Sequence, residues 1–148
     1  MIQASQRESL DSLFAQICRL KHARVQTLLE ALGLYRGQPS VLHALWEQEG
    51  WTHSELAKRL HVQPATITKM IQRMEKAGFV ERRQDPVDQR VSRVYLTAAG
   101  RGIRADVQEV WRTLEREAFD GFNLEERRLL RRFFVQIREN LMGVIGGE

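Results

Sequence analysis

The stretch of sequence that decides the fold covers residues 52–97 and reads THSELAKRLHVQPATITKMIQRMEKAGFVERRQDPVDQRVSRVYLT. At its start, Thr52 and Glu55 have the spacing of a capping box, in which each side chain accepts a backbone N–H at the beginning of a helix. This spacing predicts a short helix over residues 54–60.

A second helix is predicted over residues 64–77. Pro64 suits a first helical turn, because the N–H that proline lacks has no intrahelical partner there, and Gly78 ends the pattern. Two strand-like runs follow at residues 79–84 and 91–96, joined by a turn rich in Asp and Pro. Two short helices followed by a hairpin predict a winged helix-turn-helix, whose second helix enters the major groove of DNA.

The second helix has an apolar face and a polar face. The apolar side carries Ile67, Met70, Ile71 and Met74, and the polar side carries Thr66, Lys69, Gln72, Arg73 and Lys76. The only acid near the polar face is the flanking Glu75. Because an ordinary surface helix mixes Glu with Lys, this face favours a polyanionic partner, although a plain solvated face stays open as the alternative.

Each residue type on the polar face has a function that it can perform on a DNA duplex. Arg73 suits the guanine edge and Gln72 the adenine edge, while Ala65 or the methyl group of Thr66 suits the thymine methyl. Thr68, Lys69 and Lys76 suit phosphates, which set position rather than sequence. The predicted DNA contacts are Pro64, Ala65, Thr66, Thr68, Lys69, Gln72, Arg73, Lys76, Asp88 and Arg90.

The hairpin tip supplies the last two of these residues. A narrow A·T-rich minor groove concentrates negative potential, which favours an inserted Arg90. Asp88 is expected to orient Arg90 or to serve the turn, because phosphates repel a carboxylate. A purely structural ion pair between the two is the other reading.

Helical patterns flank this segment on both sides. A long helix over residues 9–32 ends at Gly33, and another runs from about Gly37 to Gly50. A fifth helix starts after Thr97 and ends at Gly121. The last helix opens with a second capping box, Asn123 with Glu126, and its apolar residues Leu129, Leu130, Phe133, Phe134, Ile137 and Leu141 are expected to face inward.

Charge is distributed unevenly along the chain. The net charge is +4, but residues 51–104 hold eleven Lys or Arg against five Asp or Glu, and the two flanks together are slightly acidic. A positive centre between slightly acidic arms is typical of a polyanion-binding module with separate structural arms.

Residues 38–101 resemble the winged-helix segment of MarR-family transcriptional regulators. The wing pattern of that family, Asp-x-Arg followed by Leu-Thr and Gly, occurs here as Asp88-Gln89-Arg90, Leu96-Thr97 and Gly100. The resemblance implies a homodimer formed by the first, fifth and last helices. It also implies control of nearby genes, relieved by a small ligand or an oxidant.

Two positions depart from the family pattern. Gln63 stands where a Ser, Thr or Asp cap is common before the second helix, so that helix start is expected to be held less firmly. Gln89 stands at a wing position that is frequently Arg, which removes one potential DNA contact.

Dimerisation is also expected from the residues themselves. The terminal helices carry more large apolar side chains than a small winged-helix core needs, and burying them between two copies stabilises the pair. A two-fold dimer presents two recognition helices to a pseudo-palindromic operator in double-stranded DNA.

The expected fold class is mainly α with a small β-hairpin wing, a winged helix-turn-helix with N- and C-terminal dimerisation helices. We expect a single domain over residues 1–148, with a DNA-binding lobe at 38–101 and a helical dimerisation region at 1–33 and 102–148. The chain is expected to be cytoplasmic, because its N-terminus lacks the apolar run of a signal peptide or membrane span. No enzyme, cofactor or metal motif is found, and no membrane partner is expected.

Three further readings stay open. A winged helix used only for protein contacts is the first alternative, and redox sensing through Cys18 is the second. Cys18 lies on an apolar stripe, however, where a free cysteine is expected to act as a small apolar residue. A pocket for a small-molecule effector is the third, lined by Trp46, Tyr35 and His22, although aromatic core packing is favoured for these residues.

Overall fold

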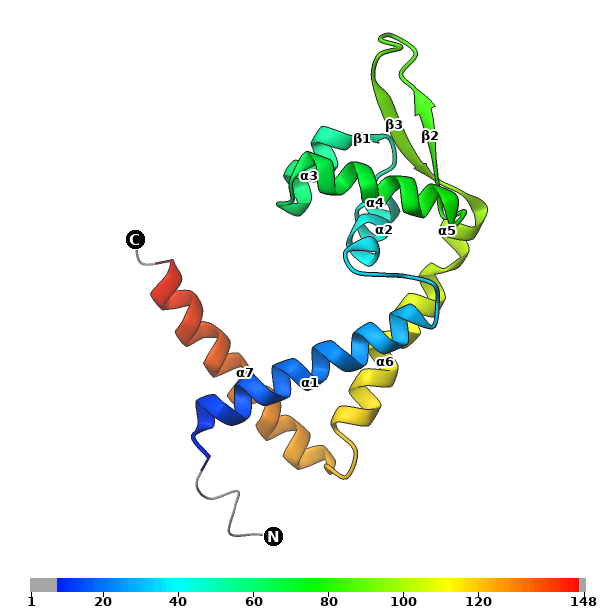
Figure 1. Cartoon of the computed structure of the whole chain (residues 1–148). Helices are drawn as coiled ribbons and strands as arrows, with labels where there is room; N and C mark the ends of the chain where they lie inside the picture. The colour runs from blue at the N-terminus through cyan, green and yellow to red at the C-terminus, as the bar shows by residue number, and fades with distance from the viewer. Residues whose placement is uncertain (1–7, 147–148) are drawn as a thin grey trace. The chain divides into compact units, whose positions relative to one another are not determined.

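A winged helix-turn-helix occupies the middle of the chain (Figure 1). Helix α3 (His53–Leu60) is followed by α4 (Pro64–Lys76), and the hairpin of β2 (Val80–Gln84) and β3 (Ser92–Leu96) extends beyond the helices at the top of the view. The predicted fold class is therefore confirmed in a computed structural model that describes residues 8–146.

The sheet has a third strand that the sequence did not predict. Strand β1 (Trp51–Thr52) pairs antiparallel with β3, so the strand order is β1-β3-β2 with β3 in the centre. Val94 pairs with Trp51 on one side and with Arg82 on the other. The wing is consequently attached to the segment that leads into α3.

The ends of α3 and α4 follow from local chemistry. Both hydrogen bonds of the predicted capping box at Thr52 are present. α3 is capped by His61, the one non-glycine residue with positive φ in the described chain, and Gly78 takes positive φ after α4. Gln63, the N-cap of α4, makes no side-chain capping hydrogen bond, as expected from its departure from the Ser, Thr or Asp pattern.

The described chain divides into two units, residues 8–114 and 115–146. In the first unit, α1 (Leu10–Glu30) begins at the N-cap Ser9, and α2 (Gln38–Glu47) follows it. The expected single helix after Thr97 is wrong, because a turn at Ile103 divides it into α5 (Ala98–Gly102) and α6 (Arg104–Ala118).

The first unit has a continuous apolar core. It joins α2, the apolar faces of α3 and α4, the sheet and one side of α6. The largest fully buried side chains are Leu34, Leu42, Leu45, Leu56, Ile67, Ile71, Met74, Val41, Val80 and Val94. Burial of Ile67, Ile71 and Met74 leaves the opposite face of α4 open to solvent.

The second unit consists of the end of α6 and α7 (Leu124–Ile145), whose capping box at Asn123 is present as predicted. The expectation that the apolar residues of α7 face inward is wrong for the single chain, since no residue of α7 is buried. Phe133 and Leu141, for example, expose half of their surface. α7 has too few neighbouring elements of its own unit to cover this face.

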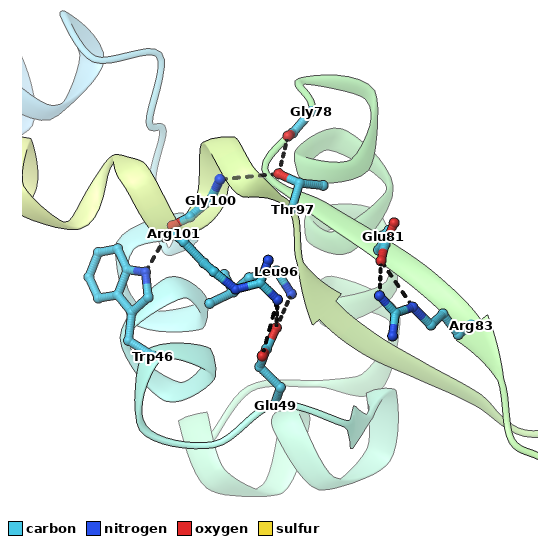
Figure 2. A network of polar contacts seen from close by, with 9 residues as sticks. All are labelled: Trp46, Glu49, Gly78, Glu81, Arg83, Leu96, Thr97, Gly100 and Arg101. Carbon is cyan, nitrogen blue, oxygen red and sulfur yellow. Dashed lines mark hydrogen bonds and ion pairs between the residues drawn. The ribbon is translucent and has the colours of Figure 1, made fainter.

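A close joint connects the wing to α5 (Figure 2). Gly100 lies so near the end of α4 and the start of β2 that an added Cβ would come within 2.1 Å of the carbonyl oxygen of Phe79. Trp46 Nε1 donates to the Gly100 carbonyl at 2.9 Å, and Thr97 Oγ1 donates to the Gly78 carbonyl. Glu49 completes the joint by accepting from Arg101 and from the backbone N–H of Leu96.

Candidate nucleic-acid interface

The polar face of α4 is exposed as the sequence predicted. Pro64, Ala65 and Thr66 in the first turn are exposed, and so are the four long polar side chains Lys69, Gln72, Arg73 and Lys76. They lie opposite the buried Ile67, Ile71 and Met74, so burial fixes which side of the helix faces outward. α4 therefore presents a continuous outward face of cations, an amide and a hydroxyl.

The cations on this face have no acidic partner in the part of the chain that the structure describes. Among residues 8–146, no ion pair involves Lys69, Arg73 or Lys76. The nearby Glu75 is bound by Arg82 of β2. The face consequently keeps its positive charge for a partner outside the chain.

Thr68 differs from the other predicted contacts on α4. Its side chain is half-buried, and its Oγ1 lies 3.4 Å from Nδ1 of His53 at the start of α3. Burial, followed by the charge of Arg82, lowers the pKa of His53 from its ordinary value. Thr68 therefore lies at the contact between the two helices.

The wing tip holds Arg90 out in solvent. Its side chain is 91% exposed, and its guanidinium donates to both carboxylate oxygens of Asp88, at 3.1 and 3.3 Å. The backbone N–H of Arg90 donates to Asp88 as well, and these bonds lower the pKa of Asp88. Asp88 therefore pairs with Arg90, as both the orienting role and the purely structural ion pair require.

Two residues that the sequence analysis did not assign organise the wing where its tip meets the two strands. Asp85 accepts from Arg93 Nε at 2.6 Å, and Arg93 Nη1 also donates to the carbonyl oxygen of Gly50 at 2.8 Å. The sequence offered one signal for this pair, an acid and a base on opposite sides of the same turn.

A family model and a sequence relative both match this chain. Residues 34–92 match the model of the MarR family. The HTH-type transcriptional regulator TtmR of Methylorubrum extorquens (strain PA1) is 31% identical over 142 residues, which cover 91% of this chain and 72% of that protein. The chain belongs to the MarR family.

Solved structures of MarR-family proteins share the fold. Wild-type MarR from E. coli in its apo form is 25% identical, with a TM-score of 0.71 over 88% of this chain and 96% of that one. A variant of MepR from S. aureus bound to an oligodeoxyribonucleotide has a TM-score of 0.74 at 20% identity, and the match covers 91% of this chain and 99% of that one. This second likeness supports the fold alone.

Of the three residues expected to line an effector pocket in this MarR-family protein, only Trp46 lines a cavity in the structure. Trp46 packs against the core and lines a surface cavity of about 530 Å³ together with His43, Arg104 and Trp111. Tyr35 and His22 are exposed and do not line that cavity, so neither core packing nor this pocket accounts for them. Tyr35 lies in the loop before α2, and His22 lies on an outward side of α1.

Three further findings on residues 8–146 of this MarR-family protein concern membrane spans, metal sites and the place of Cys18. No helix in that range is both long enough and apolar enough to cross a membrane. The same range contains no cluster of three or more His, Cys, Asp or Glu suited to a metal. Cys18 is exposed on α1, so in the single chain it does not pack into the core as a small apolar residue.

Proposed function

We propose that this MarR-family protein binds double-stranded DNA sequence-specifically as a homodimer and represses transcription from the bound site. The observation that carries the proposal is the exposed face of α4, whose cations have no acidic partner within residues 8–146. A face of this composition matches the major groove, where Arg and Gln read base edges and Lys contacts phosphates.

The proposed contacts follow the positions of the side chains. Arg73 and Gln72 read bases, with Ala65 and Thr66 at the start of the helix, and Pro64, Lys69 and Lys76 complete the contact near the phosphates. Thr68 acts at the rim of this contact, since its side chain is only partly exposed.

Arg90 is proposed to enter the minor groove beside the recognition helix, with Asp88 orienting it. The high exposure of Arg90 and its two hydrogen bonds to Asp88 support this role.

Dimerisation is supported by apolar side chains that the single chain leaves in solvent. Leu10, Phe14 and Ile17 follow one side of α1, and Phe133 and Ile137 are four residues apart on α7. Exposed apolar surface of this extent marks an interface. A two-fold dimer would place two α4 helices in half-sites about 10 base pairs apart.

The proposal assigns separate tasks to parts of one domain. Residues 38–101 form the DNA-binding lobe, and residues 1–33 and 102–148 form the dimerisation region. The relatives are named as transcription regulators rather than as enzymes. Because such a regulator acts on chromosomal DNA, the proposal places the protein in the cytoplasm.

A small-molecule effector that relieves repression is part of the proposal. The cavity beside Trp46 lies in the first unit and combines aromatic rings with the cation Arg104. Such a lining suits an aromatic anion.

Selection of bound fragments from genomic DNA, followed by anisotropy titrations of a selected duplex at several salt concentrations, tests the proposal. Several phosphate contacts require the affinity to fall steeply as salt is added. Arg90→Ala should weaken binding mainly to duplexes with A·T-rich flanks, whereas Arg83→Ala removes a cation of the same hairpin that is paired with Glu81 and should have a smaller effect. Absence of DNA binding, or binding that ignores salt, would instead support a winged helix used for protein contacts.

A further inference from the structure

Arg93 connects two segments that lie far apart in the sequence. From β3 its Nε donates to Oδ2 of Asp85 at the start of the wing tip, and its Nη1 donates to the carbonyl oxygen of Gly50, immediately before β1. The two side chains are partly shielded, with 33% of Arg93 and 13% of Asp85 exposed. A single guanidinium therefore joins the tip of the wing to the segment that leads into α3.

Asp85 uses its two carboxylate oxygens for different neighbours. Oδ2 accepts from Arg93, whereas Oδ1 accepts from the backbone N–H groups of Val87 and Asp88, at 2.8 and 3.0 Å. The Arg93 side chain and then these two N–H groups lower the pKa of Asp85 to about 2, so the carboxylate is ionised at neutral pH. The turn of the tip and its attachment to the sheet both depend on this group.

Hydrogen bonds through Asp88 connect Asp85 to Arg90. The backbone N–H of Asp88 is held by Asp85, and the Asp88 carboxylate in turn accepts from the backbone and the guanidinium of Arg90. The sequence of contacts therefore runs from Gly50 through Arg93, Asp85 and Asp88 to the exposed guanidinium.

We propose that Arg93 is a positioning residue for the wing, which acts through Asp85 to set where Arg90 is held relative to α3 and α4. This inference rests on the proposed function and extends it. It assigns a share of the DNA specificity to a residue that does not itself contact a base. Holding the tip in its bound arrangement removes part of the ordering cost of binding, and it fixes the spacing between the minor-groove and major-groove contacts.

A purely electrostatic role for the same pair predicts a different result. If only charge mattered, Arg93→Gln would weaken DNA binding and Asp85→Asn would strengthen it, because the second change removes a negative charge near phosphates. If Arg93 positions the wing, both changes should weaken binding to a duplex whose minor groove Arg90 contacts. The direction of the Asp85→Asn effect therefore separates the two explanations.

The test uses the full chain and a duplex selected from bound genomic fragments. Two versions of that duplex are compared, one with adenine and one with diaminopurine in the A·T flanks. Diaminopurine adds an amino group in the minor groove and keeps the adenine pattern in the major groove, so the ratio of the two dissociation constants reports recognition through the minor groove, where the wing binds.

Arg83→Gln is the matched control. Arg83 is the cross-strand partner of Arg93 in the sheet, and its substitution by Gln removes the same charge. Its carboxylate partner is Glu81 on β2 rather than a residue of the tip. We expect Arg93→Gln and Asp85→Asn each to weaken binding to the adenine duplex roughly tenfold and to reduce discrimination against diaminopurine, whereas Arg83→Gln keeps that discrimination. Stronger binding by Asp85→Asn, or unchanged discrimination in both variants, overturns the proposal.

Two further measurements exclude a merely structural role. In an Arg90→Ala background, Arg93→Gln should add less than about twofold to the loss, because its effect passes through Arg90; full additivity contradicts positioning. Hydrogen exchange of the Val87 and Asp88 amides should accelerate in Arg93→Gln and not in Arg83→Gln, and equal exchange also overturns the proposal. Amide exchange could accelerate in Arg93→Gln while Arg90→Ala leaves the discrimination between the two duplexes unchanged. The proposed minor-groove contact of Arg90 would then be wrong, and Arg93 would have no share in DNA specificity.

Discussion

Arg73 lies in the exposed face of α4, with no ion-pair partner among the described residues. We expect Arg73→Ala to weaken binding to a selected duplex by ~1 to 3 kcal/mol and to relax the base preference at one position, because a bidentate guanine contact is lost. Arg112→Ala is the control, since Arg112 is an exposed cation on α6 that pairs with Glu109. Equal losses in the two variants would mean that only total charge matters.

Asp85 gives a second prediction for a single residue. Its pKa lies at about 2 instead of 3.8, with the hydrogen bond from Arg93 as the largest cause. Because the folded-state pKa is lowered, the stability that this carboxylate contributes is present above pH 3.8 and is lost as the pH falls toward 2.

NMR titration of the Asp85 carboxyl carbon tests this prediction. In Arg93→Gln the midpoint should rise toward the ordinary value, whereas in Arg83→Gln it should stay where it is in the parent protein. An ordinary midpoint in the parent would contradict the prediction.

At the residue scale, the sequence predicted the α4 face because helical periodicity alone places Lys69 and Arg73 opposite Ile67 and Ile71. It did not predict the role of Arg93, because that role depends on contacts with Asp85 and with the distant Gly50. Contacts across a turn and between distant segments have no period in the sequence.

At the scale of elements, substitution of Gly100 tests how closely α5 packs on the segment between α4 and β2. In Gly100→Ala the new methyl group would overlap the Phe79 carbonyl, so we expect a loss of about 1 to 3 kcal/mol or more in the free energy of unfolding. Gly102→Ala in the same helix meets nothing within 4 Å and should change stability by less than about 1 kcal/mol, in the favourable direction.

Urea unfolding of the two glycine variants measures both values. Similar stability of Gly100→Ala and Gly102→Ala would show that the joint between α5 and its neighbours relaxes without cost.

Most element boundaries followed from caps and glycines, but two did not. Strand β1 has only two residues and exists through its pairing with Val94 and Arg93, so no alternation marks it in the sequence. α5 ends at a glycine, Gly102, but apolar spacing continues through Ile103 into α6, so the pattern predicted one helix. Tertiary packing decides both features.

At the scale of the whole molecule, the exposed apolar residues of α7 lead to a prediction about assembly. Light scattering at micromolar concentration should give the mass of a dimer, and Ile137→Glu should shift the protein toward monomer, because a charge would be buried at the interface. Val87→Glu is the control, since Val87 is an apolar residue of the wing that is 96% exposed. A monomeric parent would contradict the dimer, and equal masses of the two variants would contradict the place of Ile137 in its interface.

The projecting hairpin also offers a practical way to measure how much of the protein is bound to DNA. Trypsin cleaves after arginine, and the side chain of Arg90 is exposed in the same turn as the exposed Val87. A duplex seated on the wing would shield that peptide bond. The rate at which the chain is nicked there would then measure operator occupancy without any label on protein or DNA.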